Sequence, residues 1–379
     1  MKKINTRNLI KYGFFLSVIV LISLLTACQG FVRFKKDFEN AKSSQTSSNQ
    51  NTKKILAEEF NLKSASDVAQ KEIYGLLTVK DFDAIEKAAN KAREKKERLA
   101  GGYWKLDSLY EALTNIYAEY RGQEVTDEMW KNRIEILKRW KENSPESITA
   151  RVALAKTYIG YGWFARGDGY INTISEENYD LLHERLDMAE KELLEADKLN
   201  VKCPRWYREM LFLGMAKGVS LDEFNRIYED AIKFEPNYLQ FYLVKSENLT
   251  PKWNGERGDW QKFVDELPSK LATLETDESD IIYFTVVVNK LKETSLGINF
   301  AMLSKERIKK GFADMDKKYD VDNLRLNQFA FVACLTQELP SAREAFDRIG
   351  DDWNKEVWGQ QTFVQMKQFA GQNGNVARK

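Results

Sequence analysis

The sequence predicts an all-α protein, and three observations indicate this class. Only 6 prolines and 20 glycines occur in 379 residues, which favours long helices over a fold with many tight turns. Apolar residues recur at the spacing of one helix face along most of the chain. Hydrophobic residues make up 43% of the chain and aromatic residues 12%, so large side chains are available to pack helix against helix.

The segment 1–27 is expected to form an export signal rather than part of this body. Four basic side chains lie between Met1 and Lys11, and an apolar run from Phe14 to Leu25 follows them. A membrane-spanning helix needs about 20 apolar residues. The run is therefore too short to serve as a good anchor, and it has the length of the apolar core of a signal peptide.

The end of this run is Leu25-Thr26-Ala27-Cys28. This tetrapeptide resembles the lipobox of bacterial lipoproteins, in which the cysteine thiol is diacylated, the chain is cut before it and the new amine is acylated. The resemblance implies that Cys28 is the lipidation site and that fatty acyl chains such as palmitate hold the protein on a membrane. Gln29 follows instead of Asp, which by the same resemblance favours the outer membrane, facing the periplasm. The alternative is an ordinary secretory signal with a chance cysteine.

Residues 28–53 are expected to be the lipidated cysteine and a flexible tether. Residues 40–53 are rich in Ser, Gln and Asn and lack apolar periodicity. Residues 54–379 are expected to form the helical body, which is long enough for one elongated unit or for two domains.

In the first part of the body, residues that favour helix starts and helix ends lie on either side of segments with one apolar face. Ser66 is a plausible N-cap, and Phe82 and Ile85 begin one apolar face at helical spacing. Thr126 precedes two acidic residues and begins a helix that Pro145 ends. The predicted helices here are 67–77, 81–96, 103–119 and 126–142.

In the middle of the body, prolines mark the helix ends. Pro204 begins a helix, whereas Pro236 and Pro251 each end one. Leu186 and Leu193 keep helical register in the longest segment. The predicted helices here are 148–164, 179–198, 204–217, 221–234 and 237–249.

In the last part of the body, one segment is ambiguous. Residues 281–288 have high β propensity, but the flanking pattern is helical, so we expect a helix there. The predicted helices are 260–266, 280–291, 304–318, 324–335, 341–349 and 355–370.

The spacing of special residues predicts how these helices associate. A tetratricopeptide unit is about 34 residues long, and Pro204 and Pro236 are separated by nearly that length. Tyr228, Ala231 and Pro236 match the aromatic, alanine and proline positions that close such a unit. Phe224 occupies a position that is normally small. We therefore expect divergent tetratricopeptide-like helical hairpins that form an α-solenoid or superhelix.

A second set of residues concerns the region from about Trp130 to Val264, with a weaker echo from Cys334 to Trp358. The set is 144–147, Ala150, 153–155, 162–167, Gly169, 184–186, Ala189, Leu193, 204–207, Tyr228, Ala231, Pro236, Tyr238 and 251–255. With it the region resembles an uncharacterised bacterial family of helical proteins, known only as a domain of unknown function. The family tends to have Arg and Gly where this chain has Lys252 and Asn254. The resemblance implies a tetratricopeptide-like fold and no particular activity.

Composition and residue inventory argue against several function classes. The chain carries 58 basic and 57 acidic side chains; without the four bases of the signal, 54 bases face 57 acids, a net charge of −3 that gives no reason to expect nucleic-acid binding. His183 is the only histidine, which leaves little room for a catalytic triad or a metal site with two histidines. Cys203 and Cys334 could pair in an exported protein, but we expect two buried thiols.

Two loops rich in Trp and Gly are the best candidates for a binding site. Trp163 and Arg166 lie beside one, and Trp253 and Gly255 lie in the other. Such groups suit a binding groove, although the stronger explanation is structural: tryptophan packs a hairpin corner and arginine caps helix carbonyls. We expect a membrane-anchored scaffold for a protein or peptide partner, without enzymatic activity, cofactor or metal. The alternatives are an enzyme of unknown chemistry with a site near Trp163, Arg166 and Trp253, and an immunity or envelope-assembly factor.

Overall fold

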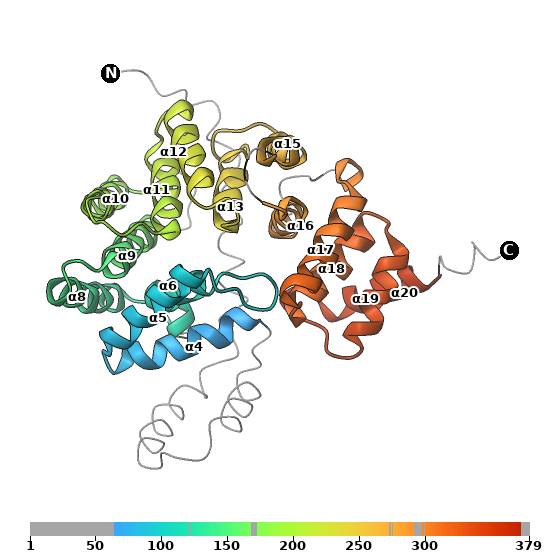
Figure 1. The fold of residues 1–379 in the computed structure, drawn as a ribbon, viewed down its shortest axis with the longest axis horizontal. Helices are drawn as coiled ribbons and strands as arrows, with labels where there is room; N and C mark the ends of the chain where they lie inside the picture. Colours follow the sequence, from blue (N-terminus) through green and yellow to red (C-terminus); the bar gives the residue numbers. More distant parts are fainter. Residues whose placement is uncertain are drawn as a thin grey trace, which may run out of the picture. The chain divides into compact units, whose positions relative to one another are not determined.

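A computed structural model describes residues 64–120, 123–167, 173–272, 274, 276–291, 298 and 300–372. The predicted signal, Cys28 and the predicted tether lie outside the described residues. Within the described part of the chain, the structure has 17 α-helices and no β-strand (Figure 1). The prediction of an all-α fold is therefore confirmed.

The chain divides into two compact units. The first contains Ser66–Lys95 and Leu106–Val201, and the second contains Lys96–Lys105 and the described residues from Lys202 onward. The segment Lys96–Lys105, which connects two helices of the first unit, therefore belongs to the second.

The first unit is held together by aromatic side chains between its helices. The ring of Trp140 stacks on Phe82 with centroids 5.3 Å apart, and Trp130 stacks on Tyr161 at 5.9 Å. Gly160 allows the approach of Trp130, because a Cβ at Gly160 would lie 2.7 Å from the indole. The helices are α4 (Ala65–Thr78), α5 (Phe82–Lys95), α6 (Lys105–Thr114), α7 (Ile116–Glu119), α8 (Asp127–Asn143), α9 (Ile148–Arg166) and α10 (Glu176–Asp197).

The second unit contains one continuous hydrophobic core, to which Trp104 of the connecting segment contributes. Phe312 and Phe329 stack within it, with ring centroids 3.8 Å apart. The helices are α11 (Pro204–Lys217), α12 (Leu221–Phe234), α13 (Leu239–Asn248), α14 (Asp259–Asp265), α15 (Leu267–Leu271), α16 (Ser279–Lys290), α17 (Lys305–Tyr319), α18 (Asn323–Leu335), α19 (Leu339–Ile349) and α20 (Gln360–Gln372), with a 3₁₀ turn at Phe300–Met302.

The segment with high β propensity is helix α16, as the flanking pattern predicted. Its residues from Ile281 to Val288 are all buried, so helix packing rather than local propensity decides their conformation. Helix α17 approaches α16 closely at Gly311, where an added Cβ would overlap the carbonyl oxygen of Asp280.

Several predicted boundaries were wrong: the helix predicted at 355–370 begins only at Gln360, and α15 was not predicted. Three other differences have a local reason. The predicted helix 103–119 is interrupted at Asn115, whose side chain accepts from the backbone N–H of Ala118 and starts α7. Ser66 is not an N-cap but lies inside α4, where its hydroxyl bonds to Ser108. Helix α10 begins earlier than predicted because Ser175 caps it, accepting from the N–H of Asn178.

Consecutive helices pack against one another in both units, as predicted hairpins require. Contacting neighbours include α9 with α10, α11 with α12, and α18 with α19. Ala231 is fully buried, as expected for the small residue of a hairpin, and the bulky Phe224 is buried as well. The finer expectation of a solenoid or superhelix stays a prediction.

Candidate functional site

Trp163 and Arg166, the first pair of predicted binding residues, lie in the last turn of α9. The Arg166 guanidinium lies over the Trp163 ring, 5.4 Å from its centroid, and donates to the carbonyl oxygen of Gly167 at 2.9 Å. Gly167 ends the helix with φ of 71°. Arg166 therefore has a capping role, and both side chains are half-buried.

Trp253 and Gly255, the second pair, lie in the turn after α13. The Trp253 Nε1–H donates to Glu247 Oε1 at 3.0 Å, and the ring packs against the core of the second unit. A Cβ at Gly255 would overlap the backbone of Leu249, so only glycine fits this close turn. These contacts give the pair a packing role. The two predicted pairs belong to different compact units.

The single histidine and the two cysteines of the predicted body pack against neighbouring side chains or lie buried. His183 contacts the ring of Tyr179, with centroids 4.4 Å apart. Cys203 and Cys334 are both buried thiols that form no disulfide, and burial raises the pKa of Cys334 to about 11. Among the described residues there is no group of His, Cys, Asp and Glu that could hold a metal ion.

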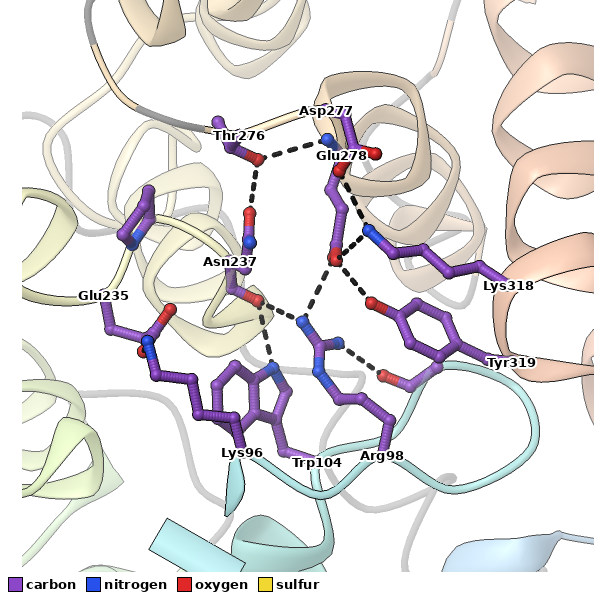
Figure 2. A network of polar contacts seen from close by, with 12 residues as sticks. Lys96, Arg98, Trp104, Glu235, Asn237, Thr276, Asp277, Glu278, Lys318 and Tyr319 are labelled. Carbon is purple, nitrogen blue, oxygen red and sulfur yellow. Dashed lines mark hydrogen bonds and ion pairs between the residues drawn. The ribbon is translucent and has the colours of Figure 1, made fainter. Parts of the chain in front are cut away.

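The second unit contains a buried polar network that the sequence did not predict, centred on Glu278 (Figure 2). Only 2% of this residue is exposed. Its carboxylate accepts from Arg98 Nη2 at 3.1 Å, from Lys318 Nζ at 3.0 Å and from the hydroxyl of Tyr319. Two cations and a hydroxyl thus compensate one buried carboxylate.

Arg98 is the group that links this network to the connecting segment. Its guanidinium lies over the Trp104 ring at 4.2 Å and donates to the carbonyl oxygens of Asn237 at 2.7 Å and Gly102 at 2.9 Å. The Trp104 indole N–H donates to the same Asn237 oxygen at 2.9 Å. The fork-shaped guanidinium therefore meets acceptors at its ends and a ring at its face, as Figure 2 shows for the labelled residues.

The electrostatics of the network favour the charged form of Lys318. Burial opposes the charge on Lys318, but its hydrogen bonds to Asp277 and Glu278 outweigh burial and raise the pKa of the ammonium. Burial, and then the hydrogen bond donated to Glu278, raise the pKa of Tyr319 to about 12 against the charge of Arg98. The network is closed and paired, which suits a structural clamp rather than a reaction centre.

In contrast to the closed network around Glu278, the second unit also has a hollow at its surface. It has a volume of about 570 Å³ and is walled by α12, α13, α14 and α15. Lys245 of α13 reaches it although only 8% of this residue is exposed. Its ammonium donates to Asn225 Oδ1 and lies 5.2 Å and 5.7 Å from the ring centroids of Phe224 and Tyr228.

Lys245 differs from the other two lysines of this hollow, because both of those are paired. Lys262 lies 3.3 Å from Asp259, and Lys270 lies 2.7 Å from Glu266. Among the described side chains, no carboxylate lies within ion-pair distance of the Lys245 ammonium, whose polar contact is with Asn225. Burial, and then the charge of Lys270, lower the pKa of Lys245 to about 8.

Comparison of the chain with protein-family models, with curated proteins and with solved structures found no match. The resemblance to a helical family of unknown function therefore stays a prediction. In the part of the chain that the structure describes, no helix combines the length and apolar character that crossing a bilayer requires.

Proposed function

We propose that this chain is a lipid-anchored helical scaffold of the cell envelope that binds a protein or peptide partner. The observation that carries the proposal is the pattern of the amino terminus: a basic start, a short apolar run and Leu25-Thr26-Ala27-Cys28. The acyl chains on Cys28 attach the protein to the outer membrane on its periplasmic side, and residues 29–53 separate the body from the bilayer.

The helical body supports a binding role. Packed pairs of consecutive helices present long side-chain surfaces, and repeat proteins of this kind commonly bind extended partners. The half-buried Trp163 with Arg166 over its ring is the first surface to test, since tryptophan and arginine often dominate the energy of protein interfaces.

The anchor is tested by Cys28→Ser in the full chain, expressed in a bacterium that exports lipoproteins. We expect the variant to leave the membrane fraction or to accumulate with its signal uncut, while circular dichroism of the purified body keeps its helical spectrum. Normal cutting and unchanged membrane fractionation of Cys28→Ser would overturn the proposed anchor.

The scaffold is tested by pull-down from gently solubilised envelopes. Wild type should recover a defined partner, Trp163→Ala should lose it, and Trp206→Ala should retain it. Trp206 is a matched control because it is also half-buried but lies in the other unit. If no partner is recovered in repeated pull-downs while a panel of metabolites is turned over, the scaffold proposal fails and the enzyme alternative replaces it.

A further inference from the structure

The hollow beside Lys245 combines three features of a site for a reactive amine. A lysine lies at its wall with most of its surface buried. Aromatic rings of Phe224 and Tyr228 flank the ammonium, and an amide oxygen rather than a carboxylate meets it. Partly buried Ile232 and Leu249 add apolar surface to the same hollow. The volume of about 570 Å³ suits a small organic molecule.

The charged groups around Lys245 do not restore an ion pair. Glu229 of α12 lies on the hollow and favours the charged ammonium, whereas Lys270 of α15 disfavours it. The other charged groups that line the hollow lie on α14 or at its end. Asp259 pairs with Lys262, and Glu266 pairs with Lys270. The acidic groups at the rim are thus engaged with other lysines, except Glu229.

Burial has a chemical consequence for this lysine. With a pKa of about 8, about a quarter of the Lys245 side chain is the neutral amine at pH 7.5. An exposed lysine with its ordinary pKa of about 10.4 is neutral only about once in a thousand molecules at that pH. Since only the neutral amine carries a lone pair for bond formation, Lys245 is far better prepared to act as a nucleophile.

We propose that Lys245 captures a small aromatic or aliphatic aldehyde in this hollow as an imine. The amine lone pair attacks the carbonyl carbon and forms the C–N bond. The carbonyl oxygen then leaves as water with two protons from the nitrogen, and a C=N double bond results. The step is a condensation and needs no oxidant or reductant. The rings of Tyr228 and Phe263 and the aliphatic Leu249 provide the surface for the apolar part of the aldehyde.

The inference is independent of the scaffold proposal, since it depends on no partner protein and no lipid. Its test uses the full chain, 4-hydroxybenzaldehyde as the probe and cyanoborohydride to fix any imine as a stable secondary amine. Peptide mapping by mass spectrometry then measures the labelling rate of each lysine between pH 6 and 10.

We expect Lys245 to be labelled at least about tenfold faster than Lys262 and Lys270 at pH 7.5, with a rate that rises around pH 8. Lys245→Arg should remove this rapid label, and the matched variant Lys262→Arg should retain it. Because the three lysines are compared inside the wild-type protein, the test does not depend on the folding of a variant. Equal or slower labelling of Lys245, or a midpoint near pH 10, would overturn the proposal.

Discussion

Two polar sites in the second unit differ in how a buried charged group is compensated by its neighbours. At Glu278, one carboxylate meets two cations and a hydroxyl, and each partner has further acceptors or rings. At Lys245, one ammonium meets an amide oxygen and two aromatic rings but no carboxylate among the described side chains. The network around Glu278 is closed by side chains, whereas Lys245 lies on a hollow.

Burial alone does not indicate function. A buried charge whose partners are complete costs much to disturb, because removal of one partner leaves the others without compensation. For a buried lysine without an opposite charge, burial instead lowers the pKa of the ammonium, so the side chain gains chemical reactivity and contributes little to stability. Substitutions at the two sites test this difference.

Glu278→Ala should produce the largest loss of stability. It leaves the buried Arg98 side chain without its carboxylate partner and also removes one partner of the exposed Lys318. Breaking the buried Arg98–Glu278 ion pair in this way costs about 3–5 kcal/mol in free energy of unfolding. Urea denaturation followed by tryptophan fluorescence measures the cost.

Asp277→Ala is the matched control: Asp277 also pairs with Lys318, but its side chain is 81% exposed, so we expect a change below about 1 kcal/mol. Similar costs for both variants would contradict the description of Glu278 as the centre of the network.

Tyr319→Phe should produce a smaller loss in the same network. The variant removes one donor to Glu278, which costs about 1–3 kcal/mol because the acceptor is charged and buried. The pKa of Tyr319 is raised to about 12 in the folded protein, so its contribution is complete below pH 10 and disappears as the pH rises through 12. The stability difference between wild type and Tyr319→Phe should therefore be smaller at pH 11 than at pH 8. A difference that grows with pH would show that the hydroxyl is not the stabilising group.

The fold class could be predicted from local pattern, but exact helix ends could not. Periodicity correctly identified helix α16 despite its β-branched residues, because the flanking helices set the context. The break at Asn115 was missed because an asparagine inside an apolar pattern gives no sign that its side chain will cap the next turn.

The two polar sites differ in how much the sequence could reveal. The partners of Arg98 in the network, Asn237 and Glu278, lie 139 and 180 residues away, and in a chain with 30% charged residues no local pattern selects them. Lys245 did leave a local signal. Tyr242, Lys245 and Leu249 are spaced three and four positions apart, so the lysine shares a helix face with a buried tyrosine.

Lys245→Met should have the smallest effect on stability, and its dependence on pH carries the information. At pH 7 we expect a change within about 1 kcal/mol, because an apolar side chain of similar length replaces a buried cation that has no carboxylate partner among the described side chains. The folded pKa of Lys245, about 8, is lower than the unfolded value near 10.4, so between these pH values the unfolded chain binds more protons and wild-type stability rises with pH. Urea denaturation at pH 7 and pH 10 should show that the free energy of unfolding of wild type increases with pH relative to that of Lys245→Met. Lys262→Met, which removes an ion pair of an exposed lysine, serves as the control for loss of a charge at the hollow and should cost below about 1 kcal/mol at pH 7. If the difference between wild type and Lys245→Met stays constant from pH 7 to pH 10, Lys245 titrates alike in the folded and unfolded chains, and the contrast with Glu278 disappears.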